Sequence, residues 1–215
     1  MATYLQTVNA VLARLRESSV STVSQTAYSA LIGKFVNDAK RQVEDSFNWD
    51  ALAITIPVTT SAATSTYTVT GSGNRFKVDA VNDSTNKARL RNVPIQWILD
   101  QQQLTTVQNA APSYYAFNGF SGGDARVELY PTPNGTFTLQ FNLYVPQADL
   151  SADSDTILVP TNGIEMLAYA RALVERGEDG GLSSSEAYAM GKQILADEIA
   201  IEASRFVENS TWDAV

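Results

Sequence analysis

The amino-acid sequence predicts an α+β protein: a four-helix bundle, an antiparallel β-sheet or small barrel inserted between helices two and three, and an extended C-terminal tail. Three observations support this. Apolar residues recur at the helical period of about 3.6 residues near both ends of the chain, and alternate as in a strand through its middle. The chain has 215 residues, 44% of them hydrophobic, which is enough to bury a core. Terminal helices are expected to pack together, so the strands form an insertion.

The expected organisation has three parts. Residues 1–50 and 160–208 form the helical bundle, residues 51–159 form a β-rich insertion domain, and residues 209–215 form a polar C-terminal tail.

The first fifty residues predict two helices. Thr3 and Gln6 have the spacing of a capping box, in which each side chain bonds the other residue's backbone amide. The second helix is predicted to begin near Thr22 and Gln25 and to run to about Asn48. The apolar positions of the two helices are Leu5, Val8, Val11, Leu12 and Leu15, then Tyr28, Leu31, Ile32, Phe35, Ala39, Val43 and Phe47.

The middle of the chain predicts strands and one short helix. The strands are expected at residues 53–58, 66–70, 75–81, 89–93, 114–117, 126–130 and 136–145, and the helix at 95–103. The last strand is the clearest, because Phe137, Leu139 and Phe141 alternate with polar residues. Residues 71–74 and 131–135 have the glycine, proline and asparagine content of hairpin loops.

The last third of the chain predicts two more helices. Asn162 and Glu165 are expected to cap the third helix, and Gly177 is expected to end it. Ser183 and Glu186 have the spacing of another capping box, which would open the fourth helix.

Composition excludes several kinds of chemistry. The chain has no cysteine and no histidine, so disulfides, zinc fingers, cysteine nucleophiles and the Ser-His-Asp triad are ruled out. The net charge of −8 disfavours non-specific nucleic-acid binding. We expect no enzyme, although a site made of two carboxylates stays open because sequence does not give their separation. No secretory leader or membrane-spanning run is recognisable.

No cofactor or metal site is expected either. Asp149, Asp153 and Asp155 resemble a calcium loop in composition, but the glycine of the sharp turn and the closing glutamate are missing. The glycine pairs at 71/73 and 122/123 are not followed by a helix, as a phosphate loop requires.

The charge is unevenly distributed. Residues 148–215 hold four basic and thirteen acidic residues, while the rest of the chain is close to neutral. Three acids, Glu175, Glu178 and Asp179, gather at the end of the third predicted helix, where the helix dipole favours cations.

A short basic pattern lies in the middle of the chain. Lys87, Arg89 and Arg91 alternate, which would place them on one face of a strand as a basic stripe or as edge protection. Trp212 lies in a polar tail, where an aromatic ring can anchor to a partner or pack back on the bundle.

Four stretches of the sequence resemble the head-to-tail adaptor proteins of tailed, chiefly short-tailed, phages, which are also called connector or tail tubular proteins. They are VNAVLARLRE at 8–17, FVNDAKRQVEDSFNW at 35–49, LYPTP at 129–133 followed by YVP at 144–146, and ERGED at 175–179. The second stretch is the strongest, and the matching order along nearly the whole chain supports all four.

The resemblance implies a structural virion protein made in the host cytoplasm and placed at the head–tail junction. Such adaptors form a ring, usually of twelve copies, beneath the portal protein. The ring extends the channel through which viral DNA passes without specific binding, and it offers a docking surface to the tail nozzle or tube. Another tail accessory or tail-completion protein is the main alternative, and a carboxylate-based cell-wall hydrolase is a more remote one.

The resemblance also gives candidate roles to residues. The C-terminal segment would dock on the portal through Trp212, Asp213 and Val215. The acids Glu175, Glu178 and Asp179 would face the DNA channel. The basic residues Lys87, Arg89 and Arg91 would contact a neighbouring copy or the nozzle. No membrane, cofactor or metal is implied.

Overall fold

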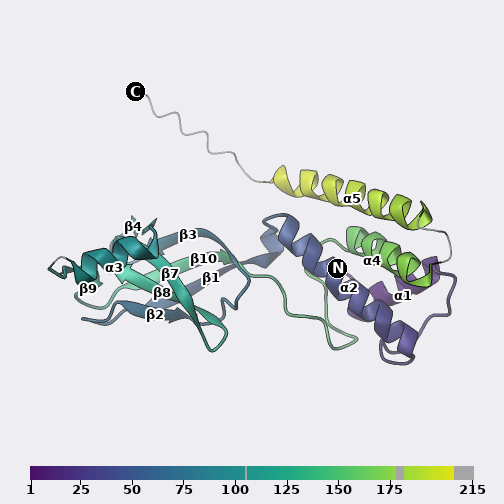
Figure 1. Ribbon diagram of the computed structural model, residues 1–215, viewed down its shortest axis with the longest axis horizontal. Coiled ribbons are helices and arrows are strands. Elements are labelled where there is room, and N and C mark those ends of the chain that lie inside the picture. The colour runs from purple at the N-terminus through teal and green to yellow at the C-terminus, as the bar shows by residue number, and fades with distance from the viewer. Residues whose placement is uncertain (105, 178–181, 206–215) are drawn as a thin grey trace, which may run out of the picture. The chain divides into compact units, whose positions relative to one another are not determined.

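The computed structural model describes residues 1–104, 106–177 and 182–205, and its chain forms two compact units (Figure 1). The helical unit consists of Met1–Ala51 with Gln147–Val215, and the β unit consists of Leu52–Pro146.

The helical unit is built on three mutually packed helices. These are α1 (Tyr4–Arg14), α2 (Ala27–Ser46) and α4 (Thr161–Arg176), and each contacts the other two. A fourth helix, α5 (Leu182–Ala203), packs mainly on α4, which separates it from α1 in the ribbon (Figure 1). Apolar side chains from the three central helices fill the core, including Val8, Val11, Leu12, Ile32, Val36, Val43, Ile164 and Leu167.

The helix ends partly follow the predicted caps. The capping box of Thr3 and Gln6 is confirmed, and Gly177 ends α4 in the left-handed conformation, with φ of 64°. The predicted start of the second helix is wrong: Thr26 and Ser29 form its capping box, while the Gln25 side chain accepts a hydrogen bond from Ser21.

The other two predicted caps are also wrong. Pro160 precedes α4 without any side-chain cap, and Asn162 already lies inside the helix. Ser183 likewise lies within α5, whose bounds begin at Leu182.

The α+β class is confirmed, but the helix count is not. The predicted fold class counts four helices, whereas the described residues form five; the fifth is α3 (Ile95–Gln103) in the β unit, which confirms the short helix predicted at 95–103. The expected closed bundle of four helices is not confirmed, since α5 has α4 as its principal partner rather than joining α1 and α2 around one core. Residues 209–215, the expected extended tail, lie outside the described part of the chain.

The β unit contains two four-stranded sheets and a two-stranded pair. One sheet has the order β1-β10-β3-β4 and the other β2-β8-β7-β5, while β6 pairs with β9. All pairs are antiparallel except β5–β7 and β6–β9. The strands are β1 (Ala53–Thr59), β2 (Thr66–Val69), β3 (Lys77–Asp83), β4 (Ala88–Arg89), β5 (Arg91–Asn92), β6 (Asn109–Ala110), β7 (Tyr114–Ser121), β8 (Asp124–Tyr130), β9 (Thr132–Pro133) and β10 (Thr138–Tyr144).

The two larger sheets share one core. Ile56 and Phe141 from the first sheet join Val69, Val127 and Leu129 from the second in a single cluster of buried side chains. The predicted alternation along β10 is confirmed, because Leu139, Phe141 and Leu143 are all at most 1% exposed. Helix α3 adds a smaller cluster in which Ile98 is buried and the Trp97 ring packs at a tilt against Tyr114 and edge-on against Tyr130.

Both predicted hairpin loops are wrong for the same reason. Residues 71–74 join β2 to β3, and residues 131–135 lie between β8 and β10, but in each case the flanking strands belong to different sheets. These turns therefore carry the chain from one sheet to the other. The segment 131–135 also contains β9, which pairs with β6.

Candidate functional site

The basic residues Lys87, Arg89 and Arg91 do not lie on one strand. Lys87 occupies a turn with φ of 57°, Arg89 is in β4, and Arg91 is in β5 of the other sheet. Buried Leu90 marks the crossing between the sheets. The predicted strand at 89–93 is thus two short strands, and the predicted basic stripe along one strand face is not formed.

The structure brings two of these three side chains together. Arg89 and Arg91 line a surface hollow of about 770 Å³, together with Asp79 and Tyr115. Arg89 Nη2 donates to the Asp79 carbonyl oxygen at 3.3 Å. Lys87 is not among the residues of the hollow, although all three side chains are exposed. The hollow therefore presents two guanidinium groups to solvent.

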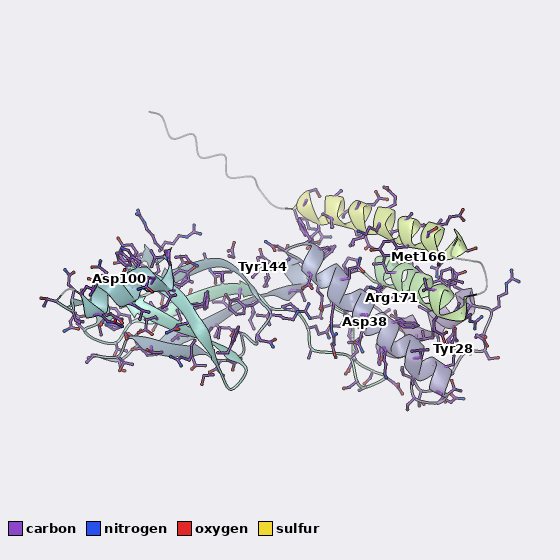
Figure 2. The ribbon with its side chains drawn as sticks, viewed as in Figure 1. Tyr28, Asp38, Asp100, Tyr144, Met166 and Arg171 are labelled. Atoms are coloured by element: carbon purple, nitrogen blue, oxygen red, sulfur yellow. The ribbon has the colours of Figure 1, made fainter. Side chains whose placement is uncertain are left out.

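Of the three candidate channel acids, the structure describes only Glu175, which is exposed in the last turn of α4. Glu178 and Asp179 lie outside the described residues. The neighbouring Arg176 supplies the cation that a helix C-terminus favours, and it anchors this end of α4. Its Nε donates to the Tyr28 hydroxyl at 2.8 Å, and its Nη2 is paired with Glu17. Tyr28 lies in the first turn of α2 and is labelled in Figure 2.

The candidate portal-docking residues Trp212, Asp213 and Val215 also lie outside the described residues. The last described residue, Arg205, is one of those that line a hollow of about 380 Å³ on the helical unit. Trp49 and Glu198 also line this hollow.

Two glutamates fix the last turns of α5 beside that hollow. Glu202 is 8% exposed, and its Oε1 accepts from the Asp50 amide at 3.0 Å while Oε2 pairs with Arg205. Glu198 lies four residues earlier and points at Gly163 in the first turn of α4. Burial raises the pKa of the Glu198 carboxyl, and a hydrogen bond from the Gly163 amide partly opposes that rise.

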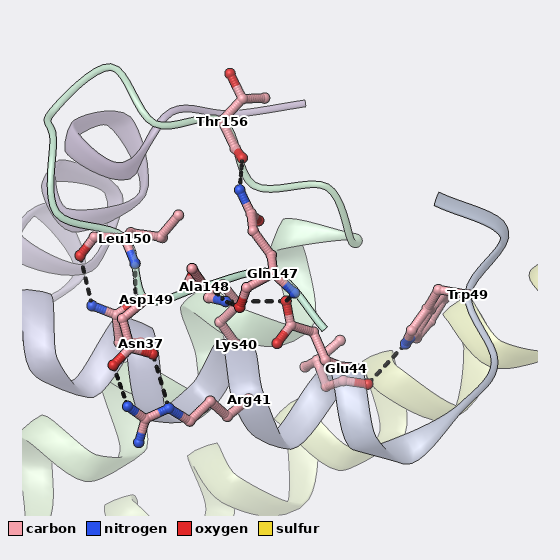
Figure 3. Close-up of polar contacts among 11 residues, drawn as sticks. Asn37, Lys40, Arg41, Glu44, Trp49, Gln147, Ala148, Asp149, Leu150 and Thr156 are labelled. Atoms are coloured by element: carbon pink, nitrogen blue, oxygen red, sulfur yellow. Dashed lines mark hydrogen bonds and ion pairs between the residues drawn. The ribbon is translucent and has the colours of Figure 1, made fainter. Parts of the chain in front are cut away.

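A polar clamp on α2 holds the chain where it returns from the β unit (Figure 3). We use "clamp" for Asn37, Lys40, Arg41 and Glu44 with the segment 147–150 that they bind. The Lys40 and Glu44 side chains are fully buried and pair at 3.0 Å. Lys40 Nζ also donates to the carbonyl oxygens of Gln147 at 2.7 Å and Ala148 at 3.1 Å. The Gln147 amide in turn donates to Glu44 Oε1.

The clamp continues along the same side of α2. Asn37 bonds Leu150 twice, with Nδ2 donating to the carbonyl oxygen and Oδ1 accepting from the amide. Arg41 forms an ion pair with Asp149 (Figure 3). Positions 37, 40, 41 and 44 fall on one side of a helix, so one stripe of α2 satisfies a whole stretch of irregular backbone.

Sequence reasoning missed the clamp, although a signal was present. Lys40 and Glu44 stand four and eight residues after Val36, on the side of α2 that carries buried Val36 and Val43. Charged residues on an apolar helix face need partners, and here they find each other and the returning backbone. The clamp coincides with the stretch 35–49, which carried the strongest resemblance to phage adaptors. Its closing Trp49 is 1% exposed and donates from Nε1 to the Val43 carbonyl oxygen.

The three aspartates that resemble a calcium loop have local structural roles. Asp149 pairs with Arg41, and Asp153 Oδ1 accepts from the Val23 amide at 2.9 Å. Asp155 Oδ2 accepts from the amides of Ser151 and Ala152, and these two bonds hold the pKa of the Asp155 carboxyl below its usual value. The three side chains therefore shape the connector between the β unit and α4.

Metal-binding clusters and membrane-spanning helices are both missing from the described residues. These residues contain no group of three or more acidic side chains arranged to hold a metal ion. No helix that the structure describes has both the length and the apolar character to cross a membrane.

Comparison with known protein families identifies the family to which the chain belongs. The family model of the SU10 adaptor protein matches residues 2–211, which takes in both units and the clamp. No curated protein matches the chain. The resemblance to phage head-to-tail adaptors is confirmed by the family match, which covers nearly the whole chain. The chain therefore belongs to the SU10 adaptor protein family and is a structural adaptor protein of a phage.

Proposed function

We propose that the chain assembles into a ring beneath the portal protein, extends the DNA channel and receives the tail nozzle or tail tube. The observation that carries this proposal is the family match from residue 2 to residue 211. Because the match includes both units, the helical unit and the β unit both belong to the adaptor. An adaptor is a virion component that contacts other head and tail proteins; the head–tail junction is the place we propose for it, after synthesis in the host cytoplasm.

The proposed ring has twelve copies. A closed ring is built from two different faces of each copy that meet head to tail. Such interfaces can be polar and wet. The composition agrees, since only 18% of residues are charged and much of the surface is left to uncharged polar side chains.

The proposed contact with the portal is the C-terminal segment 209–215. Trp212 would be its anchor, with Asp213 and Val215 beside it, because a large aromatic ring in a polar segment supplies most of the binding energy of a small contact.

The proposed channel wall includes Glu175, Glu178 and Asp179. Carboxylates repel the phosphate backbone, so DNA would slide past them without specific binding. Glu175 supports this placement, because Arg176 is engaged with Tyr28 and Glu17 while the neighbouring carboxylate is exposed.

The proposed partner of Lys87, Arg89 and Arg91 is an acidic surface of a neighbouring copy or of the nozzle. The hollow that Arg89 and Arg91 share would accept carboxylates of the partner, because a guanidinium forms paired hydrogen bonds with a carboxylate.

Mass photometry of the purified chain, alone and with the matching portal, tests the proposed function. We expect a closed ring, either free or formed only on the portal, with a mass that corresponds to twelve copies of 23.3 kDa. A truncation that ends at residue 208 should keep the fold but lose the portal, and Trp212→Ala should weaken portal binding in the same direction.

The matched control for Trp212→Ala is Thr211→Ala, which leaves the aromatic anchor in place. A chain that stays monomeric and does not bind the portal would contradict the ring adaptor. That result would favour a tail accessory protein.

A further inference from the structure

The hollow of about 770 Å³ in the β unit is a split between the strands β3 and β5. The chain segment 88–93 is continuous, and it pairs with β3 through β4 and with β7 through β5. Its pairing with β3 ends at a bond of 2.8 Å from the Leu90 amide to the Val81 carbonyl oxygen. Beyond this bond, no backbone hydrogen bond joins β3 to β5 in the part of the chain that the structure describes. The two strands therefore separate, and the hollow is lined by residues 78–81 on one side and residues 89–92 on the other.

Backbone groups on both sides of the split are open to a further strand. The two amides that flank Asn92 in the sequence both donate to carbonyl oxygens of the β7 segment, at 2.9 and 3.0 Å. Because alternate residues of a strand direct their backbone groups to opposite sides, the Asn92 amide and carbonyl face away from β7 and towards the split. On β3, the Asp79 carbonyl oxygen accepts from the Arg89 side chain at 3.3 Å rather than from a strand. An open strand edge of this kind is a template for pairing with another chain.

The split also carries positive charge. Arg89 and Arg91 are exposed, and within the described ranges neither forms an ion pair. Asp79 is the acid among the lining residues, and its carboxylate is not within ion-pair distance of either guanidinium. Each guanidinium can hold a carboxylate through two parallel hydrogen bonds. Two such groups beside open backbone therefore match a strand that carries carboxylates.

The described part of the chain does not supply such a strand to a neighbouring copy. Its most acidic segment outside helices and strands is the connector 147–160. All three aspartates of that connector are engaged, Asp149 in an ion pair, and Asp153 and Asp155 with backbone amides. We have proposed the portal as the partner of the C-terminal segment 209–215. An acidic segment of another tail protein is therefore the occupant that charge complementarity favours.

We propose that an extended, acidic segment of the tail nozzle docks in the split between β3 and β5 as an added strand. Its backbone bonds the open groups at Asp79 and Asn92, and its carboxylates pair with Arg89 and Arg91. Backbone pairing supplies affinity, while the two charges fix the register of the added strand. This inference rests on the proposed docking of the nozzle on the adaptor, and it selects the nozzle over a neighbouring copy as the partner of the two arginines.

Neutralising the two arginines tests the charged part of the contact. Arg89→Gln/Arg91→Gln should weaken the binding of the purified nozzle protein by about tenfold or more in biolayer interferometry, because two guanidinium–carboxylate pairs are lost. The matched control is Arg16→Gln/Lys34→Gln, which removes two exposed positive charges from the helical unit and should leave the affinity unchanged. Thermal melting of both variants checks that the fold is intact.

Hydrogen exchange followed by mass spectrometry tests the added strand itself. Binding of the nozzle protein should slow exchange at the amides of residues 78–80 and at Asn92, because a backbone hydrogen bond protects the amide that donates it. The turn between β7 and β8, residues 121–124, is the internal control and should exchange at the same rate with and without the nozzle. Docking through side chains alone would leave residues 78–80 and Asn92 unprotected, and that result would overturn the added strand.

A single thiol beside the hollow identifies the occupant. The chain has no native cysteine, so Ala88→Cys, at an exposed position of β4 next to Arg89, provides the one attachment point for a photoreactive cross-linker. In the complex of adaptor and nozzle, the cross-linked peptide should be an acidic segment of the nozzle. A peptide of this chain would show that a neighbouring copy fills the split, and would overturn the proposal.

This inference and the proposed function fail in distinguishable ways. If the unchanged chain does not bind the nozzle, the proposed docking of the nozzle fails and the inference fails with it. If the nozzle binds but the arginine variant binds it equally well, the proposed docking stands and the split is not its site.

Discussion

At the scale of single residues, Lys40 is the clearest example of a charge whose burial is made tolerable by its partners. We expect Lys40→Met to destabilise the chain by about 3–5 kcal/mol, because Glu44 and two carbonyl oxygens then remain buried without their cation. Urea denaturation followed by circular dichroism measures the change in the free energy of unfolding.

Two further variants make this prediction specific. Lys34→Met, on the exposed side of the same helix, should change the free energy of unfolding by no more than about 0.5 kcal/mol. Lys40→Met/Glu44→Leu should be less destabilised than Lys40→Met alone, because it removes the unpaired anion as well. A double variant as unstable as the sum of its two singles would show that the two residues act independently.

The raised pKa of the Glu198 carboxyl makes the free energy of unfolding depend on pH. Burial raises the pKa of its carboxyl above the ordinary 4.5, so the folded chain keeps this proton to a higher pH than the unfolded chain. The stability that the protonated form contributes is complete at low pH and is lost as pH rises through the raised pKa.

Glu198→Gln should therefore leave stability unchanged near pH 4 and increase it at pH 7. Denaturation at both pH values measures this, and Glu186→Gln, an exposed position on the same helix, should show no such difference. If Glu198→Gln instead loses stability at pH 7, the ionised carboxylate stabilises the start of α4, and the predicted direction is wrong.

At the residue scale, interactions between residues close in sequence were predictable, and interactions between distant residues were not. The capping box of Thr3 and Gln6 was predictable because its two members are three residues apart. The clamp was not predicted, because the backbone partners of Lys40 and Asn37 lie more than a hundred residues away. The local signal, Lys40 and Glu44 four residues apart on an apolar side of α2, indicates buried charges but does not identify the backbone that they bind.

At the scale of elements, the packing of α1 on α2 depends on one glycine. A methyl group at Gly33 would overlap the Tyr4 hydroxyl and lie 2.8 Å from Val23 Cγ1. Gly33→Ala should therefore lower the free energy of unfolding by about 1–3 kcal/mol, although alanine favours a helix. Thermal melts of the full chain measure it.

A second substitution locates the source of this effect. Tyr4→Phe removes the atom nearest to the added methyl, so Tyr4→Phe/Gly33→Ala should recover part of the loss, while the contact with Val23 remains. No recovery would mean that the strain lies elsewhere in the helix pair.

Elements with a strong period were predictable, and their pairing was not. The alternation along β10 and the helical stripe of α2 are local and survive folding. By contrast, the strand expected at 89–93 divides at Leu90 because the chain leaves one sheet for the other there. A turn's composition likewise does not say whether its flanking strands pair, as residues 71–74 show.

At the scale of the whole molecule, the chain joins two units to which we assign different tasks. The helical unit carries the acidic last third of the chain, whereas the β unit carries Arg89 and Arg91 in a shared hollow. We propose that the first builds the ring and lines its channel, and that the second offers a surface to a neighbour or to the tail. The order of the four adaptor-like stretches made the family predictable from sequence.

The central claim is that this adaptor forms a ring between the portal and the tail. Electron cryomicroscopy of particles of the phage that encodes the chain tests it most directly. We predict a twelve-fold ring immediately beneath the portal, with density that fits both the helical unit and the β unit of each copy. Density for the chain elsewhere on the tail, with the portal in direct contact with another protein, would contradict it.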